Sequence, residues 1–357
     1  MTLVKSRFLI FILFIISHFV VYSNGLEKDN QELKKEIKEY INHHVLDSYD
    51  FNLLSYTKED GSKFYFGIPL PVILWDEGLV MFSSSKFNHG ETIAKYGNNY
   101  YRLYHGKIYK TDSSGKIYYD KDKHVENNYP LDFSVTKGVV SIIFVSIIMF
   151  FLFRNLANSY KKNGMIANGI GRFIEPIVLY VRDEIAIPNI GEKNYKRYMS
   201  FLLTLFFFIW ICNMIGLTPL GINVTGNIAV TFCLALLTFI ITTVSGTKYY
   251  WKHIFWMPGM PLPMKIIMAP IELLGVIIKP FTLMIRLYAN IMAGHIVMMT
   301  LISMIFIFRN WLGSSLSFML AFFISIIEIL VALLQAYIFT ILSALYFGFA
   351  VEEEKDH

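Results

Sequence analysis

The stretch PIELLGVIIKPFTLMIRLYANIMAGH, residues 270–295, places an arginine in the middle of a long apolar segment. The apolar residues around Arg286 continue to Phe308, so the segment is long enough to cross a bilayer. A guanidinium at the centre of a membrane helix costs at least ~2.5 kcal/mol on insertion scales, and such residues usually have a functional role. Arg286 is therefore the first candidate functional residue of the chain.

The composition indicates a membrane protein with several spans. Hydrophobic residues make up 55% of the 357 residues, against roughly 45–50% in ordinary soluble domains. The net charge is +5, and the basic residues gather in a few loops, a pattern that reports membrane topology and not nucleic-acid binding. Cys212 and Cys233 lie inside apolar runs, so we expect small hydrophobic residues there and no disulfide framework.

Residues 1–24 have the features of a signal peptide. Lys5 and Arg7 precede an apolar run from Phe8 to Tyr22, and small polar residues follow it. The run has 15 residues, fewer than the ~20 that span a bilayer. A cleaved signal peptide is therefore favoured over an uncleaved anchor, and either interpretation places the next segment outside the cytoplasm.

Residues 25–134 form a charged, tyrosine-rich block without a spanning segment. Apolar residues spaced by four predict an amphipathic helix over 29–45. Runs of β-branched and aromatic residues predict strands at 63–66, 72–75 and 79–82 and a hairpin region at 100–104, 107–110 and 116–119. His43 and His44 are adjacent and would point in different directions on a helix, so a solvated pair is favoured over a metal site. The block is predicted to be a small α+β extension with no metal or cofactor site.

The membrane domain is predicted over 135–351, followed by an acidic tail over 352–357. Five apolar segments are expected to span the membrane, and they cover 139–153, 199–215, 228–244, 270–308 and 316–349. Eight basic residues between 154 and 198 mark that loop as cytoplasmic. Five spans after an exported N-terminus place the C-terminus in the cytoplasm too. Within the loop, Gly171 to Ile185 mixes apolar and charged residues, which predicts an amphipathic helix on the membrane surface.

The last two segments are longer than one crossing requires. The first holds ~39 residues, near 58 Å at 1.5 Å per residue and about twice the thickness of a bilayer core. Such a segment must tilt strongly, lie partly in the membrane plane or fold as a hairpin. The predicted fold class is an all-α polytopic membrane protein with about five transmembrane helices, the last two long and strongly tilted or hairpin-like, and a small α+β extracytoplasmic N-terminal extension.

The interior polar residues of these two segments form a pattern. They are Glu272, Lys279, Arg286, Asn290 and His295 on the first segment and Glu328 and Gln335 on the second. Helical spacing puts the first four near one face, while the histidine lies ~13.5 Å beyond the arginine along the axis, on the opposite side. If the helices run antiparallel with Gln335 beside Arg286, then His295 and Glu328 lie at a similar depth, ~10–14 Å outward of the arginine.

This pattern fits the movement of protons. Histidine and carboxylate side chains can carry protons across a low-dielectric path, whereas arginine keeps its proton, so we expect two half-paths separated by a permanent positive charge. Simpler roles compete with this interpretation. Arg286 could snorkel, His295 could serve only as a hydrogen-bonding group, Asn290 and Gln335 could hold helices together, and Glu272 and Lys279 could form a surface pair.

Around these residues the sequence resembles subunit a of the F-type ATP synthase, the channel subunit of its membrane sector. The resemblance rests on Lys279-Pro280, on Arg286-Leu-x-Ala-Asn290-x-x-Ala-Gly294-His295, on Pro270-x-Glu272 and on Leu334-Gln335-Ala-Tyr-Ile-Phe. Asn213-x-x-Gly216-Leu-x-Pro219 and Thr225-Gly-Asn227 resemble the second and third helices of the family. The similarity covers about 135–351, and the motif centred on the arginine is highly specific.

The resemblance implies roles for these residues. Arg286 would be the essential stator arginine that faces the carboxylates of a ring of subunit c, with Lys279, Asn290 and Gln335 as polar neighbours. His295 and Glu328 would line the outer half-channel, and Glu272 would line the inner one. Some members carry a carboxylate where this chain has His295 and a histidine where it has Glu328, which suggests that the two positions act as a pair.

The resemblance also implies partners and a location. These are the ring of subunit c, the subunit b stator and the remainder of the complex, in the lipid bilayer of a bacterial cell inner membrane. It implies no cofactor, no nucleic acid and no bond chemistry in this chain.

Two other functions compete with this hypothesis. A proton- or ion-coupled secondary transporter with its substrate near Arg286 predicts internal repeats and interrupted helices in matched halves, and the sequence shows no such symmetry. The second alternative is a scaffold that helps the complex to assemble and transports nothing. That hypothesis does not explain why the last two apolar segments are so long. H⁺ and Na⁺ both stay open as the coupling ion, because the rotor subunit binds most of that ion.

Overall fold

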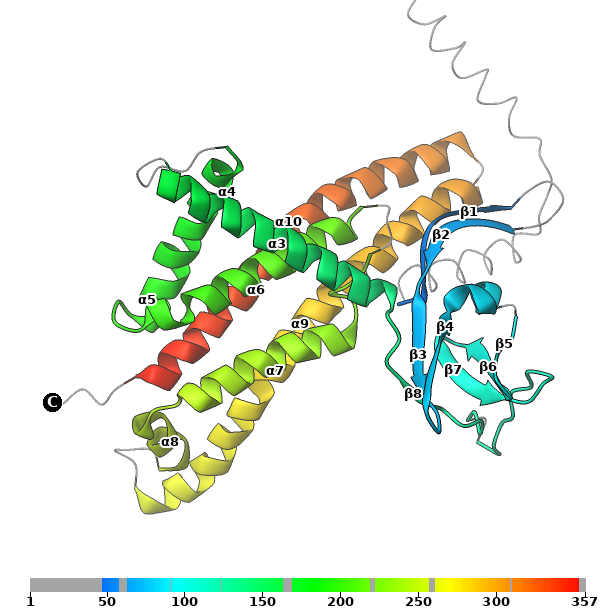
Figure 1. Ribbon diagram of the computed structural model, residues 1–357. Coiled ribbons are helices and arrows are strands. Elements are labelled where there is room, and N and C mark those ends of the chain that lie inside the picture. The colour runs from blue at the N-terminus through cyan, green and yellow to red at the C-terminus, as the bar shows by residue number, and fades with distance from the viewer. Residues whose placement is uncertain are drawn as a thin grey trace, which may run out of the picture. The chain divides into compact units, whose positions relative to one another are not determined.

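The computed structural model describes residues 47–57, 63–90, 92–122, 124–162, 169–218, 222–256, 261–308 and 310–352. This part of the chain is mostly helical, with a small β-rich region at its N-terminal end (Figure 1). The predicted signal peptide, the predicted helix over 29–45, the pair His43 and His44 and most of the acidic tail lie outside the described residues.

The helices follow the predicted apolar segments. They are α3 (Lys137–Lys162), α4 (Ile170–Tyr180), the π-helix η2 (Val181–Ala186), α5 (Ile187–Ile190), α6 (Tyr195–Gly216), α7 (Ile228–Ser245), α8 (Lys248–Phe255), α9 (Leu262–Phe308) and α10 (Trp311–Val351). Within the described residues, α3, α6, α7, α9 and α10 are the five helices long and apolar enough to cross a membrane. The predicted number of spans is thereby confirmed.

The last two helices are each continuous. α9 has 47 residues and α10 has 41, each assigned as a single helix. A hairpin within either segment was therefore the wrong alternative, whereas the strong tilt stays a prediction. α9 begins at Leu262, ahead of the predicted Pro270, and it contains both Pro270 and Pro280.

The predicted amphipathic helix is present as three consecutive helical pieces, α4, η2 and α5. Its apolar residues Ile174, Val181 and Ile185 are buried in the common core of the helices. The Tyr160 hydroxyl on α3 donates to Glu175 on α4 at 2.8 Å, and the exposed Arg182 pairs with Asp183 at 2.6 Å. One face is thus apolar and packed while the other carries charge, and the location on the membrane surface stays a prediction.

α10 packs through small residues. Ala332, Ala336, Thr340 and Ser343 follow one face of α10 and are at most 1% exposed. Small side chains let helix backbones approach closely, which stabilises packing inside a membrane. The outward faces are apolar instead, for example at Ile278 and Ile285 of α9, which are 56% and 55% exposed. Such surfaces suit a lipid environment.

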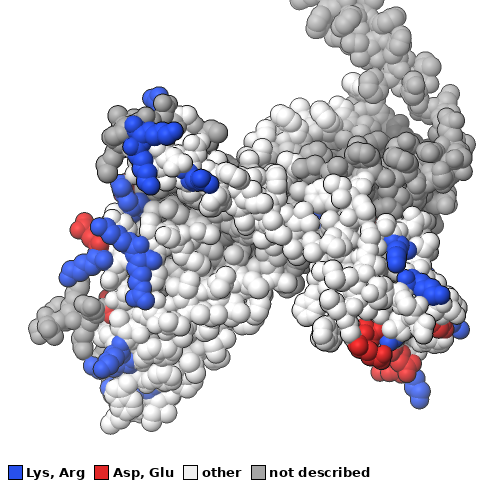
Figure 2. Space-filling view, in the orientation of Figure 1, with Lys and Arg blue, Asp and Glu red and all other residues white. Residues whose placement is uncertain are grey.

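The basic residues lie together in space as well as in sequence. Figure 2 shows Lys and Arg side chains gathered over α4, α5 and the region of α8. The loop before α6 and the loop after α7 therefore lie at the same end of the helices. Two predicted spans, 199–215 and 228–244, separate these loops, so the predicted topology also places both on one side of the membrane.

Residues 296–325 form a compact helical hairpin, made of the end of α9 and the start of α10. The Ser314 hydroxyl donates to the Ile305 carbonyl at 2.9 Å, and the Ser325 hydroxyl donates to the Met298 sulfur at 3.6 Å. The turn between the two helices therefore has polar contacts of its own.

The β-rich region confirms that a small folded extension precedes the membrane helices. Its elements are β1 (Asp50–Thr57), β2 (Lys63–Pro69), β3 (Pro71–Trp75), β4 (Leu79–Ser83), the 3₁₀ helix η1 (Ser84–Gly90), β5 (Ala94–Tyr96), β6 (Asn99–Tyr104), β7 (Lys107–Thr111) and β8 (Leu131–Asp132). They pair as three antiparallel sheets in the orders β1-β2, β4-β3-β8 and β5-β6-β7. The core of the region holds Val72, Leu74, Phe82, Tyr101 and Ile108, all buried.

The predicted hairpin is β6 and β7, joined by His105 and Gly106, whose positive φ angles of 46° and 73° suit a tight hairpin turn. The strand expected over 116–119 is reduced to an isolated bridge between Tyr119 and Val125. Side chains bind other backbone groups of this stretch, since Lys116 N donates to Asp112 and Tyr118 N to Asn127. Such local side-chain bonds compete with strand pairing.

Candidate functional site

Three contacts between α9 and α10 organise the predicted polar residues. The Lys279 ammonium lies 5.4 Å from the centre of the Tyr346 ring. Farther along α9, Asn290 Nδ2 donates to Gln335 Oε1 at 2.8 Å. Beyond that, Gly294 lies against the Glu328 carboxyl group. The three contacts occur in opposite order along the two helices, so the helices run antiparallel here.

Arg286 lies near the middle of α9 and is half-buried. It is one helical turn before Asn290, so the two share a face. No hydrogen bond or ion pair joins its guanidinium to any residue in the described part of the chain. The cation is thus without a partner of opposite charge among these residues.

Gln335 is the buried partner on α10, with 1% of its surface exposed. Its side-chain oxygen accepts from Asn290, while its Nε2 is buried without a hydrogen-bond partner in the described ranges. The antiparallel arrangement considered from the sequence set Gln335 beside Arg286, and in the structure Gln335 is hydrogen-bonded to Asn290, one turn farther along α9.

Glu328 is also buried, and neither of its carboxylate oxygens has a hydrogen-bond partner among the described residues. It packs on Gly294, where an added Cβ would lie 2.5 Å from Glu328 Oε1. The glycine therefore creates the space that the carboxyl group occupies. Its chain neighbour is His295, so the structure brings the predicted outer pair to neighbouring positions on α9 and α10.

His295 is 7% exposed and faces a second glycine. A Cβ at Gly216, the last residue of α6, would lie 3.4 Å from His295 Nε2. The histidine thus points toward α6 and the glutamate toward α9. Both glycines belong to the motifs that carry the resemblance, and the structure shows that each is a place of close approach, as small residues in membrane helices commonly are.

Comparison with known proteins identifies the family of this chain. A family model described as the ATP synthase A chain matches residues 139–348. Over 231 residues the chain is 43% identical to ATP synthase subunit a of Chloroherpeton thalassium, covering 63% of this chain and 69% of that relative. It is 41% identical over 233 residues to ATP synthase subunit a of Myxococcus xanthus, covering 64% and 76%.

The chain belongs to the ATP synthase subunit a family. The family has a proton-channel role in the membrane sector of the enzyme and is not itself catalytic. The apolar helices and the bacterial relatives fit a bacterial membrane protein. A second family model, described only as a domain of unknown function, matches residues 40–133. The extension and the subunit a region are therefore matched by separate family models.

Asn213 of the subunit a region connects three parts of the fold. It is 1% exposed, and its Nδ2 donates to the Ala332 carbonyl on α10 at 3.3 Å. Its Oδ1 accepts from the Thr225 hydroxyl at 2.7 Å, in the connection between α6 and α7. These bonds hold α6 against α10 one turn from Glu328. The sequence motif contained both side chains but did not reveal this contact.

Lys279 and Glu272 lie before Arg286 on α9, toward the N-terminal end of that helix. The rings of Tyr346 and Phe349 lie 5.4 and 5.9 Å from the Lys279 ammonium, a distance at which aromatic faces attract cations. Lys279 and Tyr346 also line a cavity with Tyr250 of α8 and Thr238 of α7. Burial raises the pKa of Tyr250, and the negative charge of Glu272 raises it further. No ion pair joins Glu272 to Lys279 within the described residues, so the surface pair considered from the sequence is not formed there.

Proposed function

We propose that this chain is the stator channel subunit of an F-type ATP synthase, with Arg286 facing the carboxylates of a ring of subunit c. The observation that carries the proposal is the unpaired guanidinium in the middle of an apolar helix. A permanent cation in such surroundings requires a counter-charge. Because the described residues supply none, a carboxylate from outside the chain is the natural partner. At ~4 Å and an effective dielectric near 20 the attraction is about 4 kcal/mol.

Glu328 and His295 form the outer half-path in this proposal. A buried carboxyl group with no partner in the described chain can exchange its proton with a mobile carrier. The adjacent imidazole is the second group that can pass a proton onward. Gly294 and Gly216 support this role, because each leaves room for one of the two side chains.

The inner half-path leads past Glu272, with Lys279 beside it at the same end of α9. Between the two half-paths, Arg286, Asn290 and Gln335 form a polar layer that carries a permanent charge. A carboxyl group of subunit c would take up a proton on the outer side, travel with the rotor and release it inward near the arginine. The arginine stays charged and thereby raises the cost of a direct leak.

The proposal includes a location and partners. The chain would lie in a bacterial inner membrane with its extension outside the cytoplasm and its C-terminus inside. It would contact subunit c, the subunit b stator and the rest of the complex, and it performs no bond chemistry itself. Proton flux compared with and without Na⁺ in the assembled complex identifies the coupling ion.

The test of the arginine is Arg286→Ala in the complex reconstituted into vesicles. We expect the complex to assemble and ATP synthesis driven by an imposed gradient to be lost. Ile285→Ala is the matched control, because Ile285 is the preceding residue and is 55% exposed. Normal synthesis by Arg286→Ala would overturn the proposal, and failure of assembly would favour a scaffold role.

The test of the outer half-path is Glu328→Gln, which keeps the side-chain volume and removes the titratable group. We expect slower proton flow, with a changed dependence of that flow on external pH. Ile329→Ala controls for altered packing, since Ile329 is 49% exposed on the same helix. If proton flow and its pH dependence equalled those of the control, Glu328 would have only a structural role.

A further inference from the structure

The sheet β4-β3-β8 of the extension is apolar on both faces. Its inner face carries Val72, Leu74, Val80 and Phe82, which are buried in the core of the extension. An antiparallel sheet with one face on a core usually presents polar side chains on the other. Here the outer face carries an apolar patch of six residues, Ile73, Trp75, Leu79, Met81, Leu131 and Phe133.

Strand pairing shows that the patch is continuous. Trp75 pairs with Leu79 on one side and with Leu131 on the other, and paired residues share a face. Ile73 pairs with Met81, and the Phe133 N–H donates to the Ile73 carbonyl at 2.8 Å. Five of the six patch side chains are more than half exposed, with exposed fractions from 52% at Met81 to 64% at Phe133. Contiguous apolar surface of this kind marks an interaction site.

The patch leads directly into a membrane helix. After Phe133, the Val135 N–H donates to the Pro71 carbonyl at 3.1 Å, so pairing with β3 continues to that point. α3, which is apolar enough to cross a membrane, begins at Lys137. Four residues extend at most ~14 Å, so Phe133 lies no farther than that from the start of the helix.

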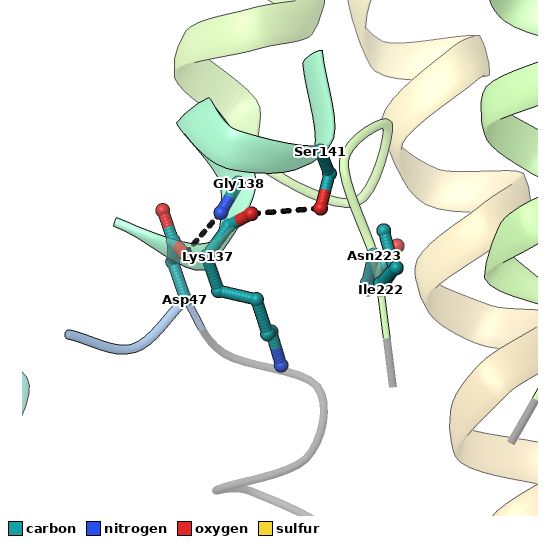
Figure 3. A pocket seen from close by; sticks show the side chains of 6 residues that line it. All are labelled: Asp47, Lys137, Gly138, Ser141, Ile222 and Asn223. Atoms are coloured by element: carbon teal, nitrogen blue, oxygen red, sulfur yellow. Dashed lines mark hydrogen bonds between the residues drawn. The ribbon is translucent and has the colours of Figure 1, made fainter. Parts of the chain in front are cut away.

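A second segment, at Asp47 and Ser48, is hydrogen-bonded to the start of the same helix. The Lys137 N–H donates to the Ser48 carbonyl at 2.9 Å, and the Gly138 N–H donates to Asp47 Oδ1 at 2.9 Å. The Thr136 hydroxyl donates to Asp47 Oδ2 at 2.8 Å. Figure 3 shows Asp47 beside Gly138 in the first turn of α3. Two chain segments therefore hold the extension at the point where α3 begins, which limits how far the patch can swing away.

We propose that the apolar patch of the β4-β3-β8 sheet rests on the lipid bilayer surface. Trp is enriched at the level of the lipid headgroups, and Trp, Phe and Leu form the apolar faces of segments that lie in the membrane interface. The six patch residues carry no charge, so the patch gains little from a polar partner and much from the apolar edge of the bilayer. The chain continues from this sheet into the membrane, which makes lipid the nearest apolar phase. The inference holds for either orientation of α3 and does not depend on the proposed proton path.

The test uses the full chain in phosphatidylcholine vesicles with a fluorophore at one position of the patch. Cys212 and Cys233 are replaced by Ala, and Met81→Cys or Leu79→Cys is labelled. Ser113→Cys, in an exposed turn that follows β7 of the separate sheet β5-β6-β7, is the matched control. Quenching is then measured with phosphatidylcholine that carries a nitroxide near its headgroup.

We expect several-fold stronger quenching at positions 81 and 79 than at position 113. Equal quenching at all three positions would overturn the proposal. Weak quenching combined with crosslinking of the patch to another polypeptide would also overturn it, and it would assign the patch to a protein partner or a second copy. The use of two labelled positions separates a local effect of one substitution from the absence of lipid contact.

Discussion

At the scale of single residues, Gly294 determines how closely Glu328 approaches α9. An added Cβ would lie 2.5 Å from Glu328 Oε1, so Gly294→Ala must displace the carboxyl group. Since the displaced atoms are the end of a flexible side chain, we expect the complex to assemble and proton flux to fall several-fold. Gly275→Ala is the control on the same helix, because a Cβ there meets nothing within 4 Å. Proton pumping driven by ATP hydrolysis measures both variants.

A rescue variant sharpens this prediction. Glu328→Asp withdraws the carboxyl group by one methylene, so the double variant Gly294→Ala with Glu328→Asp should recover part of the flux. Equal flux in the Gly294→Ala and Gly275→Ala variants would show that the close approach has no role in transport.

The sequence indicates which polar side chains lie on α9 and α10, whereas their contacts come from the structure. The apolar segments and their few polar side chains are visible in the sequence, because charge inside such segments is costly and rare. Spacing along one helix also fixed which side chains share a face. Spacing says nothing about the register between two helices, which depends on packing. For that reason the hydrogen bond between Gln335 and Asn290 and the close approaches at Gly294 and Gly216 are visible only in the structure.

At the scale of elements, the end of α10 packs against α5 through Gly348. A Cβ there would overlap the Asn189 carbonyl oxygen, which belongs to the backbone and cannot rotate away. The Thr247 N–H donates to the Ala350 carbonyl at 2.9 Å, so α10 is held from a second side. We expect Gly348→Ala to destabilise the folded chain by ~1–3 kcal/mol, the usual cost of overpacking.

Thermal unfolding of the purified chain in detergent measures this cost, with Gly275→Ala as the unstrained control. Adding Asn189→Ala should not restore stability, because the obstacle is main chain. Recovery in that double variant would mean that the Asn189 side chain, which donates to the Ile185 carbonyl at 2.8 Å, transmits the effect instead.

At the scale of the whole molecule, sequence composition separated two regions that the structure joins by specific hydrogen bonds. Composition distinguished the tyrosine-rich block from the apolar helices, since the two need different surroundings. It did not reveal that Asp47 accepts hydrogen bonds from the start of α3, because the bonded residues are 89 and 91 positions apart in the chain. Contacts between distant segments have no local sequence signal.

Asp47 acts as the cap of α3 although it belongs to another segment. Its carboxylate binds the Gly138 N–H and the Thr136 hydroxyl, so Asp47→Ala should cost ~1 kcal/mol, as the loss of a helix cap does. We expect faster hydrogen exchange at the amides of the first turn of α3 in the full chain. Asp47→Asn keeps an acceptor oxygen and should exchange nearly as slowly as the natural sequence. If Asp47→Ala left exchange in this turn unchanged, Asp47 would not be the cap, and the segment of Asp47 would be held to α3 mainly by the bond from the Lys137 N–H to the Ser48 carbonyl.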